Sequence, residues 1–290
     1  FHFFNKSVTV TYAAIWFPVI MFVFTAIAFF LFTRKIFHKE SSETKNIIAL
    51  VATAFFVLVP SWLPRSIAGI PEKESVAFGF MFLAFYLYLE AMTSEKLRSK
   101  ISFGILAGIS TAIMGLVWGG VIFIFFTIPI AFLLAFLLGN VKKDEMIIYS
   151  SWLITSFLSM MPFSTRYSIT NLVLSTSTLL AMGVFFVVLI SLLLMKSEKI
   201  EGIRKNKKIP KEIFYAILSA LILIILISVI LGYKLIINQI VEVKNSLVNP
   251  QTSRFGMTVA ENKQPYFIND WKENFGPVFK EIPLFFWMFF

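Results

Sequence analysis

The chain has 290 residues, of which 58% are hydrophobic and only 14% are charged, and phenylalanine alone accounts for 35 of them. This composition excludes an ordinary soluble domain, intrinsic disorder and collagen, because each of these needs far more polar or charged residues. The absence of cysteine excludes disulfides, thiolate metal sites and cysteine nucleophiles, and two histidines are too few for a histidine-built metal centre. We therefore expect a protein that is embedded in a lipid bilayer.

Eight mostly apolar runs approach the roughly 20 residues that a helix needs to cross about 30 Å of hydrocarbon. The fourth and fifth runs are separated at Trp118-Gly119-Gly120, where paired glycines favour a turn. The run that starts at Tyr167 is either one tilted helix or a short surface helix followed by a span from about Ser175. The predicted spans cover residues 8–32, 47–63, 75–92, 101–117, 121–138, 146–162, 167–195 and 213–237.

Basic residues are distributed unevenly between the loops. One set of alternate loops carries sixteen lysines and arginines, whereas the opposite short loops carry Arg65, Lys73 and Arg166. Loops that stay in the cytoplasm are enriched in these residues, so the sixteen bases mark the predicted cytoplasmic side. The net charge of +10 is thus explained by membrane topology, and no nucleic-acid partner is expected. Residues 64–74 and 238–283 are then extracytoplasmic in a multi-pass cell-membrane protein.

The predicted spans divide the chain into three parts. Residues 1–237 form a multi-spanning transmembrane region, residues 238–283 a long external loop, and residues 284–290 the start of a truncated further span. Because the chain opens at Phe1 and closes inside an apolar run too short to cross a bilayer, we expect it to be an internal piece of a longer protein.

The short outer loop combines an arginine, Arg65, with two carboxylates, Glu72 and Glu74. Acids spaced by two residues in a loop that contains proline and glycine can present hard oxygen ligands to a divalent cation. Alternatively, the acids complement the positive end of the next helix, and the arginine anchors a span at the membrane interface. The spacing alone leaves both interpretations open.

Several short motifs follow one another along the chain on one predicted membrane face. They are Arg65-Ser66-Ile67-Ala68-Gly69 with Glu72-Lys73-Glu74, then Ala107-Gly108, Trp118-Gly119-Gly120, and Thr258-Val259-Ala260-Glu261 with Pro265 and Trp271. In this order and spacing they resemble the catalytic subunit of oligosaccharyltransferase, in particular its archaeal branch, AglB, and the resemblance covers about the middle of a family member. It implies an all-α polytopic membrane domain of the GT-C glycosyltransferase class.

The resemblance also implies a reaction: transfer of an oligosaccharide from a dolichyl (polyprenyl) phosphate or diphosphate carrier to Asn in Asn-X-Ser/Thr. The implied partners are the lipid-linked oligosaccharide, the acceptor polypeptide and the bilayer, with a single catalytic subunit. The implied cofactor is Mg²⁺ or Mn²⁺. By the same resemblance, the metal is held by Glu72, Glu74 and Glu261, catalysis involves Glu72, Glu261 and Arg65, and the acceptor lies along Thr258, Val259, Ala260 and Glu261.

The chain departs from the family pattern in three respects. Glu72 stands where the family usually has Asp, and the extra methylene moves the carboxylate oxygens by roughly 1 Å. Asn262 stands where many relatives have His. The family's upstream catalytic acid, its later spans and its C-terminal domain have no counterpart in the sequence, so we expect this chain by itself to be inactive.

Two other functions are considered. A related polyprenyl-phosphate glycosyltransferase that acts on lipid or hydroxyl acceptors would share the acids of the short loop but would not need residues 258–261. A secondary transporter predicts ionisable residues near the bilayer centre and two related halves. The predicted spans are almost free of charge at their centres and show no internal repeat, which disfavours the transporter.

Overall fold

The computed structural model describes residues 9–59, 62–163, 167–169, 172, 175–205 and 210–232, with a few single positions between 234 and 283. Within these residues the fold is helical apart from two strands of two residues each, which pair as an antiparallel ladder. The α-helices are α1 (Val10–Ile36), α2 (Ser42–Val57), α3 (Lys73–Thr93), α4 (Leu97–Val117), α5 (Ile122–Leu137), α6 (Lys143–Met160), α8 (Thr176–Leu194), α9 (Glu198–Lys205) and α10 (Lys211–Leu231). The shorter elements are the 3₁₀ turns η1 (Leu63–Ser66), η2 (Gly119–Val121) and η3 (Met161–Phe163), and the strands β1 (Val278–Phe279) and β2 (Ile282–Pro283).

Each predicted apolar run overlaps one of these α-helices. In the described part of the chain, six helices are long and apolar enough to cross a membrane: α1, α3, α4, α5 together with the turn η2 before it, α6 and α10. Helix α2 has 16 residues and α8 is also a shorter apolar helix, so the count of eight spans stays a prediction. The expectation of an all-α membrane domain is confirmed, with β1 and β2 as a small addition inside the predicted external loop.

Helix boundaries differ from the predicted spans by several residues. Helix α1 continues to Ile36 and α4 starts at Leu97, because a helix does not stop where its apolar run meets the polar interface. Helix α10 ends at Leu231, and Gly232 follows with a left-handed φ of 84°. The predicted end of the last span at residue 237 stays a prediction, because most of the residues after 232 lie outside the described part of the chain. Helix α8 starts at Thr176, which favours the second of the two interpretations of that run.

The predicted break at Trp118-Gly119-Gly120 is confirmed. Helix α4 ends at Val117, η2 makes one 3₁₀ turn, and α5 starts at Ile122. An ideal Cβ added to Gly120 would lie 2.0 Å from the ring of Trp118, so a side chain there would collide with the indole. Glycine at this position leaves room for the Trp118 ring to pack against the turn.

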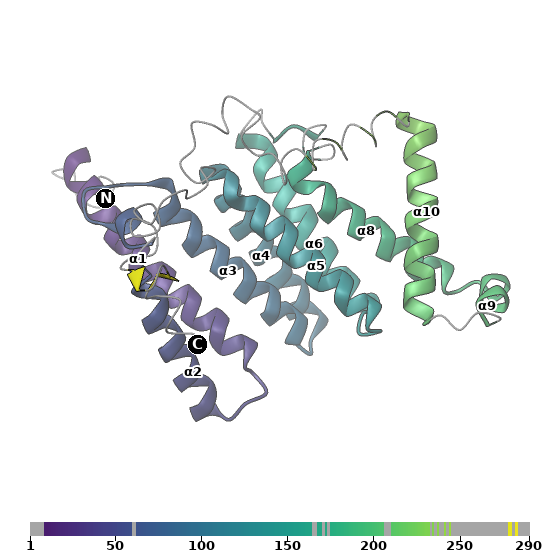
Figure 1. Ribbon diagram of the computed structural model, residues 1–290, viewed down its shortest axis with the longest axis horizontal. Helices are drawn as coiled ribbons and strands as arrows, with labels where there is room; N and C mark the ends of the chain where they lie inside the picture. The colour runs from purple at the N-terminus through teal and green to yellow at the C-terminus, as the bar shows by residue number, and fades with distance from the viewer. Residues whose placement is uncertain are drawn as a thin grey trace.

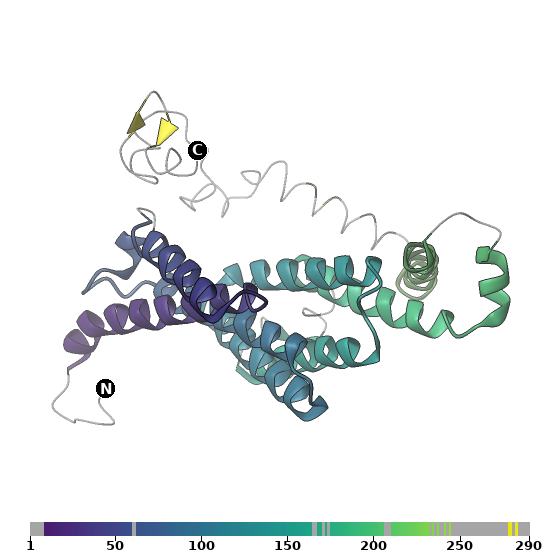
Figure 2. The same cartoon turned by 90° about the horizontal axis from the view of Figure 1, so that it is seen from below.

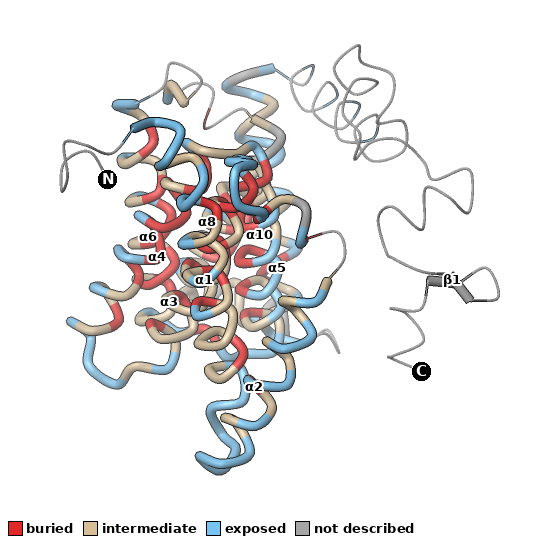
Figure 3. Tube along the Cα trace, turned by 90° about the vertical axis from the view of Figure 1, so that its left-hand side faces the viewer, coloured by how far each residue is buried: buried red, intermediate tan, exposed pale blue. Residues whose placement is uncertain are grey.

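The helices pack in a row that starts with the α1–α2 hairpin and ends with α8 and α10 (Figure 1; Figure 2 shows the same order after a quarter turn). Helix α3 packs between α1 and α4, α4 packs on α6, and α8 packs between α5 and α10. The buried positions concentrate in α3, α4, α5 and α6, while α2 is largely exposed (Figure 3). The exposed side chains on the outer helices include Ile27 and Val229, as expected where lipid is the neighbour.

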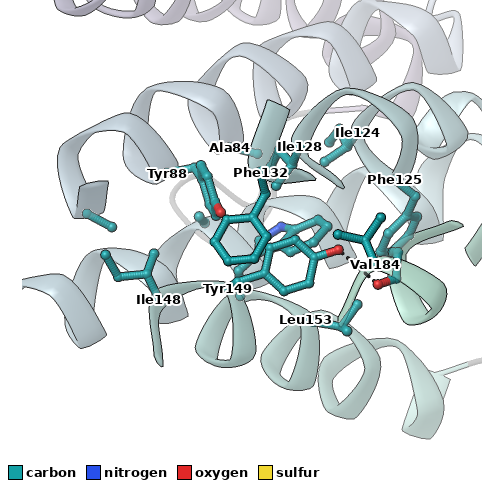
Figure 4. Close-up of a cluster of buried hydrophobic side chains, with 14 of the residues drawn as sticks. Ala84, Tyr88, Ile124, Phe125, Ile128, Phe132, Ile148, Tyr149, Leu153 and Val184 are labelled. Atoms are coloured by element: carbon teal, nitrogen blue, oxygen red, sulfur yellow. Dashed lines mark hydrogen bonds between the residues drawn. The ribbon is translucent and has the colours of Figure 1, made fainter. Parts of the chain in front are cut away.

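Aromatic side chains from α3, α5 and α6 form the centre of the core (Figure 4). Phe132 stacks on Tyr149 with ring centroids 4.4 Å apart, and Tyr88 meets Trp152 edge to face at 6.0 Å. Two hydrogen bonds tie this centre to neighbouring helices: the Tyr149 hydroxyl donates to the Ala181 carbonyl at 2.9 Å, and Trp152 Nε1 donates to Thr111 Oγ1 at 3.0 Å. The polar groups of Tyr149 and Trp152 thus find partners inside the apolar environment.

Candidate functional site

The candidate site lies at the end of the bundle where α3 and α5 begin and α4 and α6 end, which we call the rim. The 3₁₀ turn η1 carries Arg65 and is held by Trp62, whose side chain is buried. The indole of Trp62 meets the ring of Phe78 edge to face at 4.8 Å and also contacts Phe22 and Phe56. Ser66 Oγ donates to the Leu63 carbonyl at 3.1 Å. These contacts fix the backbone from which Arg65 projects.

A tight turn then brings the chain to the start of α3. The Ile70 N–H donates to the Ile67 carbonyl at 3.1 Å, and Gly69 inside this turn has a φ of 87°, a conformation that favours glycine. Glu72 is the N-cap residue of α3, and its carbonyl accepts bonds from the Ser75 N–H at 3.2 Å and the Ser75 hydroxyl at 2.7 Å. The turn and the cap together place Glu72 and Glu74 on either side of Lys73 at the helix entrance.

Arg65 lies beside both carboxylates. Its Nη1 atom is 3.8 Å from Glu72 Oε2 and 3.5 Å from Glu74 Oε1. The Glu74 side chain is only 7% exposed, whereas that of Glu72 is 43% exposed. The structure therefore brings together the three predicted site residues of the short loop. Glu74 is buried, and Glu72 is exposed at the surface.

The geometry bears on the alternative interpretation of the acids. The Glu72 side chain makes no capping hydrogen bond to α3, although Glu74 does lie in the first turn of that helix. Both carboxylates are instead within ion-pair distance of one guanidinium, so Arg65, Glu72 and Glu74 together carry an excess of one negative charge. Such a group attracts a cation or an N–H donor.

The donor chemistry of the rim fits Mg²⁺ or Mn²⁺, because both ions prefer hard carboxylate oxygens. Two carboxylates alone are few for a dedicated site, and the described part of the chain contains no group of three or more His, Asp or Glu side chains that could hold a metal. The predicted third ligand, Glu261, and the predicted acceptor-binding residues Thr258, Val259 and Ala260 lie outside the described residues.

A cavity of about 360 Å³ opens at the same rim, between the end of α4 and the chain that follows α6. Aromatic rings and small residues line the cavity. The Tyr167 hydroxyl donates a hydrogen bond to the Gly115 carbonyl, so two of the lining residues are joined. The lining residues are Gly115, Leu116, Val117, Trp118, Gly119, Phe163 and Tyr167. A cavity of this size and character can receive the flat faces of a small organic group.

Aromatic contacts connect this cavity to the charged cluster. The ring of Phe78 in α3 lies between the indoles of Trp62 and Trp118, at centroid distances of 4.8 Å and 5.6 Å. Trp62 precedes Arg65 by three residues, and Trp118 lines the cavity. The cluster and the cavity are thus parts of one packed region. The sequence showed Trp118-Gly119-Gly120 but gave no sign of Phe163 or Tyr167, since only folding brings the end of α6 beside that turn.

The long apolar helices define an integral membrane protein, and comparisons with known proteins agree with this architecture. Residues 1–200 match the family described as "Oligosaccharyl transferase STT3, N-terminal". The chain belongs to this family of oligosaccharyltransferase subunits.

Two rice (Oryza sativa subsp. japonica) proteins illustrate the sequence relationship. The glycosyltransferase subunit STT3B is 30% identical over 139 residues, which are 47% of this chain and 18% of the relative. The subunit STT3A is 32% identical over 136 residues, which are 44% of this chain and 17% of the relative. The matched part is therefore less than a fifth of either relative's length.

A solved structure shows the fold relationship. The archaeal oligosaccharyltransferase AglB from Archaeoglobus fulgidus, solved in complex with an inhibitory peptide and a dolichol-phosphate, superposes with a TM-score of 0.61. The match covers 94% of this chain and 32% of AglB, at 20% sequence identity. The helical arrangement described above is therefore that of the AglB transmembrane region.

Proposed function

We propose that this chain is part of a membrane glycosyltransferase that moves an oligosaccharide from a dolichyl (polyprenyl) phosphate or diphosphate carrier to Asn of Asn-X-Ser/Thr acceptors. The observation that carries the proposal is the rim cluster, in which one arginine lies beside a buried and an exposed carboxylate. Membership of the oligosaccharyltransferase family supports it, and so does the resemblance of residues 65–74 to that family's acidic motif. A protein within the bilayer also suits a carrier whose polyprenyl chain is anchored there.

The transfer forms a bond between the side-chain nitrogen of the acceptor Asn and the anomeric carbon of the first sugar. The bond from that carbon to the carrier phosphate oxygen breaks, and the phosphate leaves with the electron pair. The amide nitrogen loses one proton, which passes to a carboxylate or to water. Amide nitrogen is a poor nucleophile because its lone pair is delocalised, so the site must hold and orient the amide.

We assign the steps of this reaction to particular residues of the chain. Glu72 and Glu261 would accept N–H bonds or supply oxygen ligands, and Thr258 to Glu261 would lie along the acceptor peptide. Arg65 would keep the two short-loop carboxylates in place. Glu72, Glu74 and Glu261 would hold Mg²⁺ or Mn²⁺, which when bound neutralises the charge that develops on the leaving phosphate.

The aromatic cavity gives the proposal a place for the sugar. Trp118 and Tyr167 line a space of about 360 Å³, and Phe78 connects Trp118 to the charged cluster. Sugar rings have apolar faces that pack on aromatic rings. We infer that the first sugar of the carrier lies against Trp118, with its phosphate directed toward the Glu72 side of the rim.

The proposal includes a topology. The chain would cross the cell membrane eight times, with residues 1–237 as the spanning region, residues 238–283 as an external loop and residues 284–290 as the start of a further span. The rim would lie on the extracytoplasmic face, because the loops at the opposite end carry most of the lysines and arginines. A single catalytic subunit is proposed from the resemblance to AglB.

A transfer assay tests this function. The product of the complete gene is purified in detergent and mixed with lipid-linked oligosaccharide and a fluorescent Asn-X-Thr peptide, with Mn²⁺, with Mg²⁺ or with chelator. A peptide in which Gln replaces Asn is the matched control. We expect a mobility shift only for the Asn peptide, and a larger shift with cation than with chelator.

The other outcomes discriminate between the functions. A glycosylated lipid or hydroxyl acceptor with an unmodified peptide would favour the related polyprenyl-phosphate glycosyltransferase. No transfer to any acceptor, together with saturable uptake of a solute into proteoliposomes, would favour the transporter. An equal shift for the Asn and Gln peptides would contradict asparagine as the acceptor.

A further inference from the structure

A second cavity, of about 110 Å³, lies at the end of the bundle opposite the rim. It is lined by the last turns of α1, the turn that follows α1, the first turn of α2 and the last part of α3, and it is open on one side. We call it the basic cavity. Its lining residues are Leu31, Arg34, Lys35, His38, Lys45, Tyr86 and Glu90.

The charges around the basic cavity do not cancel. Arg34, Lys35 and Lys45 supply three cations and Glu90 one carboxylate, so the lining has an excess of two positive charges with His38 neutral. Lys35 Nζ lies 2.6 Å from Glu90 Oε2, so the Glu90 carboxylate forms an ion pair with Lys35. Among the described residues no carboxylate lies within ion-pair distance of Arg34 or Lys45.

Arg34 is held in position but keeps donors for a ligand. Its Nε atom donates to Asn46 Oδ1 at 2.7 Å, a bond that joins α1 to α2 across their turn. A guanidinium has five N–H groups, so this bond leaves four of them. The Tyr86 hydroxyl from α3 adds a further polar group to the wall. Preorganised N–H donors of this kind suit a tetrahedral oxyanion.

The general enrichment of cytoplasmic loops in basic residues accounts for the sign of this charge but not for its arrangement. Lys39 lies in the same turn, is exposed and takes no part in the lining. The lining residues instead converge from three helices on a space of about 110 Å³, where a water takes about 30 Å³ of liquid. The basic cavity therefore has room for a phosphate group with its oxygens.

We propose that the basic cavity binds the phosphate of an anionic phospholipid headgroup. Its position favours a lipid over a soluble phosphate. Helix α1 has 27 residues and spans about 40 Å, more than the roughly 30 Å of hydrocarbon, so its last turn lies at headgroup level. Leu31 adds an apolar side chain on the membrane side of the bases, four residues before Lys35 on the same face of α1. The lipid would bridge α1, α2 and α3 at the end away from the chemistry.

Native mass spectrometry of the complete gene product tests this proposal. The protein is exchanged into detergent with equal amounts of phosphatidylcholine and phosphatidylglycerol, and the retained lipids are counted for wild type, Arg34→Gln, Lys45→Gln and Lys45→Arg. We expect one preferentially retained phosphatidylglycerol in wild type and in Lys45→Arg. Each Gln substitution is expected to weaken that retention roughly fivefold, the effect of one base near a lipid surface.

Matched controls separate this site from general surface charge. Lys39→Gln removes a base from the same turn without changing the cavity lining, and it should retain the lipid as wild type does. An equal loss in Lys39→Gln, or wild-type retention in both Arg34→Gln and Lys45→Gln, would overturn the proposal. Displacement of the lipid by millimolar inorganic phosphate would assign the cavity to a free phosphate and overturn the lipid. Thermal unfolding of each variant identifies any loss that comes from misfolding.

Discussion

At the scale of single residues, Glu72 and Glu74 have different environments although they are two positions apart. The Glu74 side chain is 7% exposed and lies nearer to the Arg65 guanidinium, so its carboxylate is fixed by the fold. The Glu72 side chain is 43% exposed and precedes the first turn of α3, so its carboxylate can turn toward a ligand without breaking helix contacts. We therefore expect Glu72 to act on substrate and Glu74 to maintain the position of Arg65.

Two core tyrosines offer a matched test of the packing. The Tyr88 hydroxyl is buried and has no hydrogen-bond partner among the described residues, whereas the Tyr149 hydroxyl donates to the Ala181 carbonyl at 2.9 Å. Replacement of Tyr88 by Phe removes a polar group that gains nothing from burial, so Tyr88→Phe should leave the thermal unfolding midpoint unchanged or raise it. Tyr149→Phe should lower the stability by about 1 kcal/mol. The reverse order would show that the two hydroxyls have been assigned the wrong environments.

At the scale of helices, α4 and α6 approach closely because small residues of α4 face α6. An ideal Cβ on Gly108 would lie 2.7 Å from the Trp152 carbonyl oxygen and 3.1 Å from the Ser156 nitrogen, which are backbone atoms of α6. These atoms cannot move without separating the helices. Small residues permit this kind of contact in membranes, where no hydrophobic force drives helices together.

Gly108→Ala tests that contact. We expect it to destabilise the protein by about 1–3 kcal/mol, the usual cost of forcing extra volume into a packed interface. Gly183→Ala is the control, because an ideal Cβ at Gly183 in α8 meets no atom of the described residues within 4 Å. It should be neutral or slightly stabilising, since alanine favours a helix over glycine. Thermal unfolding in detergent compares the two, and equal effects would contradict the close packing of α4 on α6.

Features that depend on residues close together in the chain could be predicted from the sequence, whereas contacts between distant residues could not. Apolar runs predicted the helix middles, and Trp118-Gly119-Gly120 predicted the break, because both are local. The helix ends were missed by several residues, since helices continue beyond hydrocarbon. Lys35 and Glu90 are 55 residues apart in the chain, and no local pattern indicates that they pair. The predicted cluster of Arg65, Glu72 and Glu74 did form, because one turn joins all three.

At the scale of the whole molecule, the orientation in the membrane is open to a direct test. The 290 residues contain no cysteine, so after replacement of any cysteine elsewhere in the complete gene product by serine, a single introduced thiol reports one position. Ile70→Cys near the rim should react with a membrane-impermeant maleimide in intact cells. Lys39→Cys and Asn140→Cys, both at exposed positions of the opposite end, should react only after permeabilisation. The reverse labelling pattern would place the rim in the cytoplasm and contradict an extracytoplasmic site.

The measurement that tests the central claim most directly is peptide transfer by the complete gene product carrying Glu72→Gln. Gln keeps the size of the side chain and removes its charge, and we expect the rate to fall at least about 100-fold, as for other groups that stabilise developing charge. Glu40→Gln, an exposed acid at the opposite end, is the matched control and should transfer at the wild-type rate. Wild-type transfer by a folded Glu72→Gln protein would contradict the assignment of the rim cluster as the catalytic site.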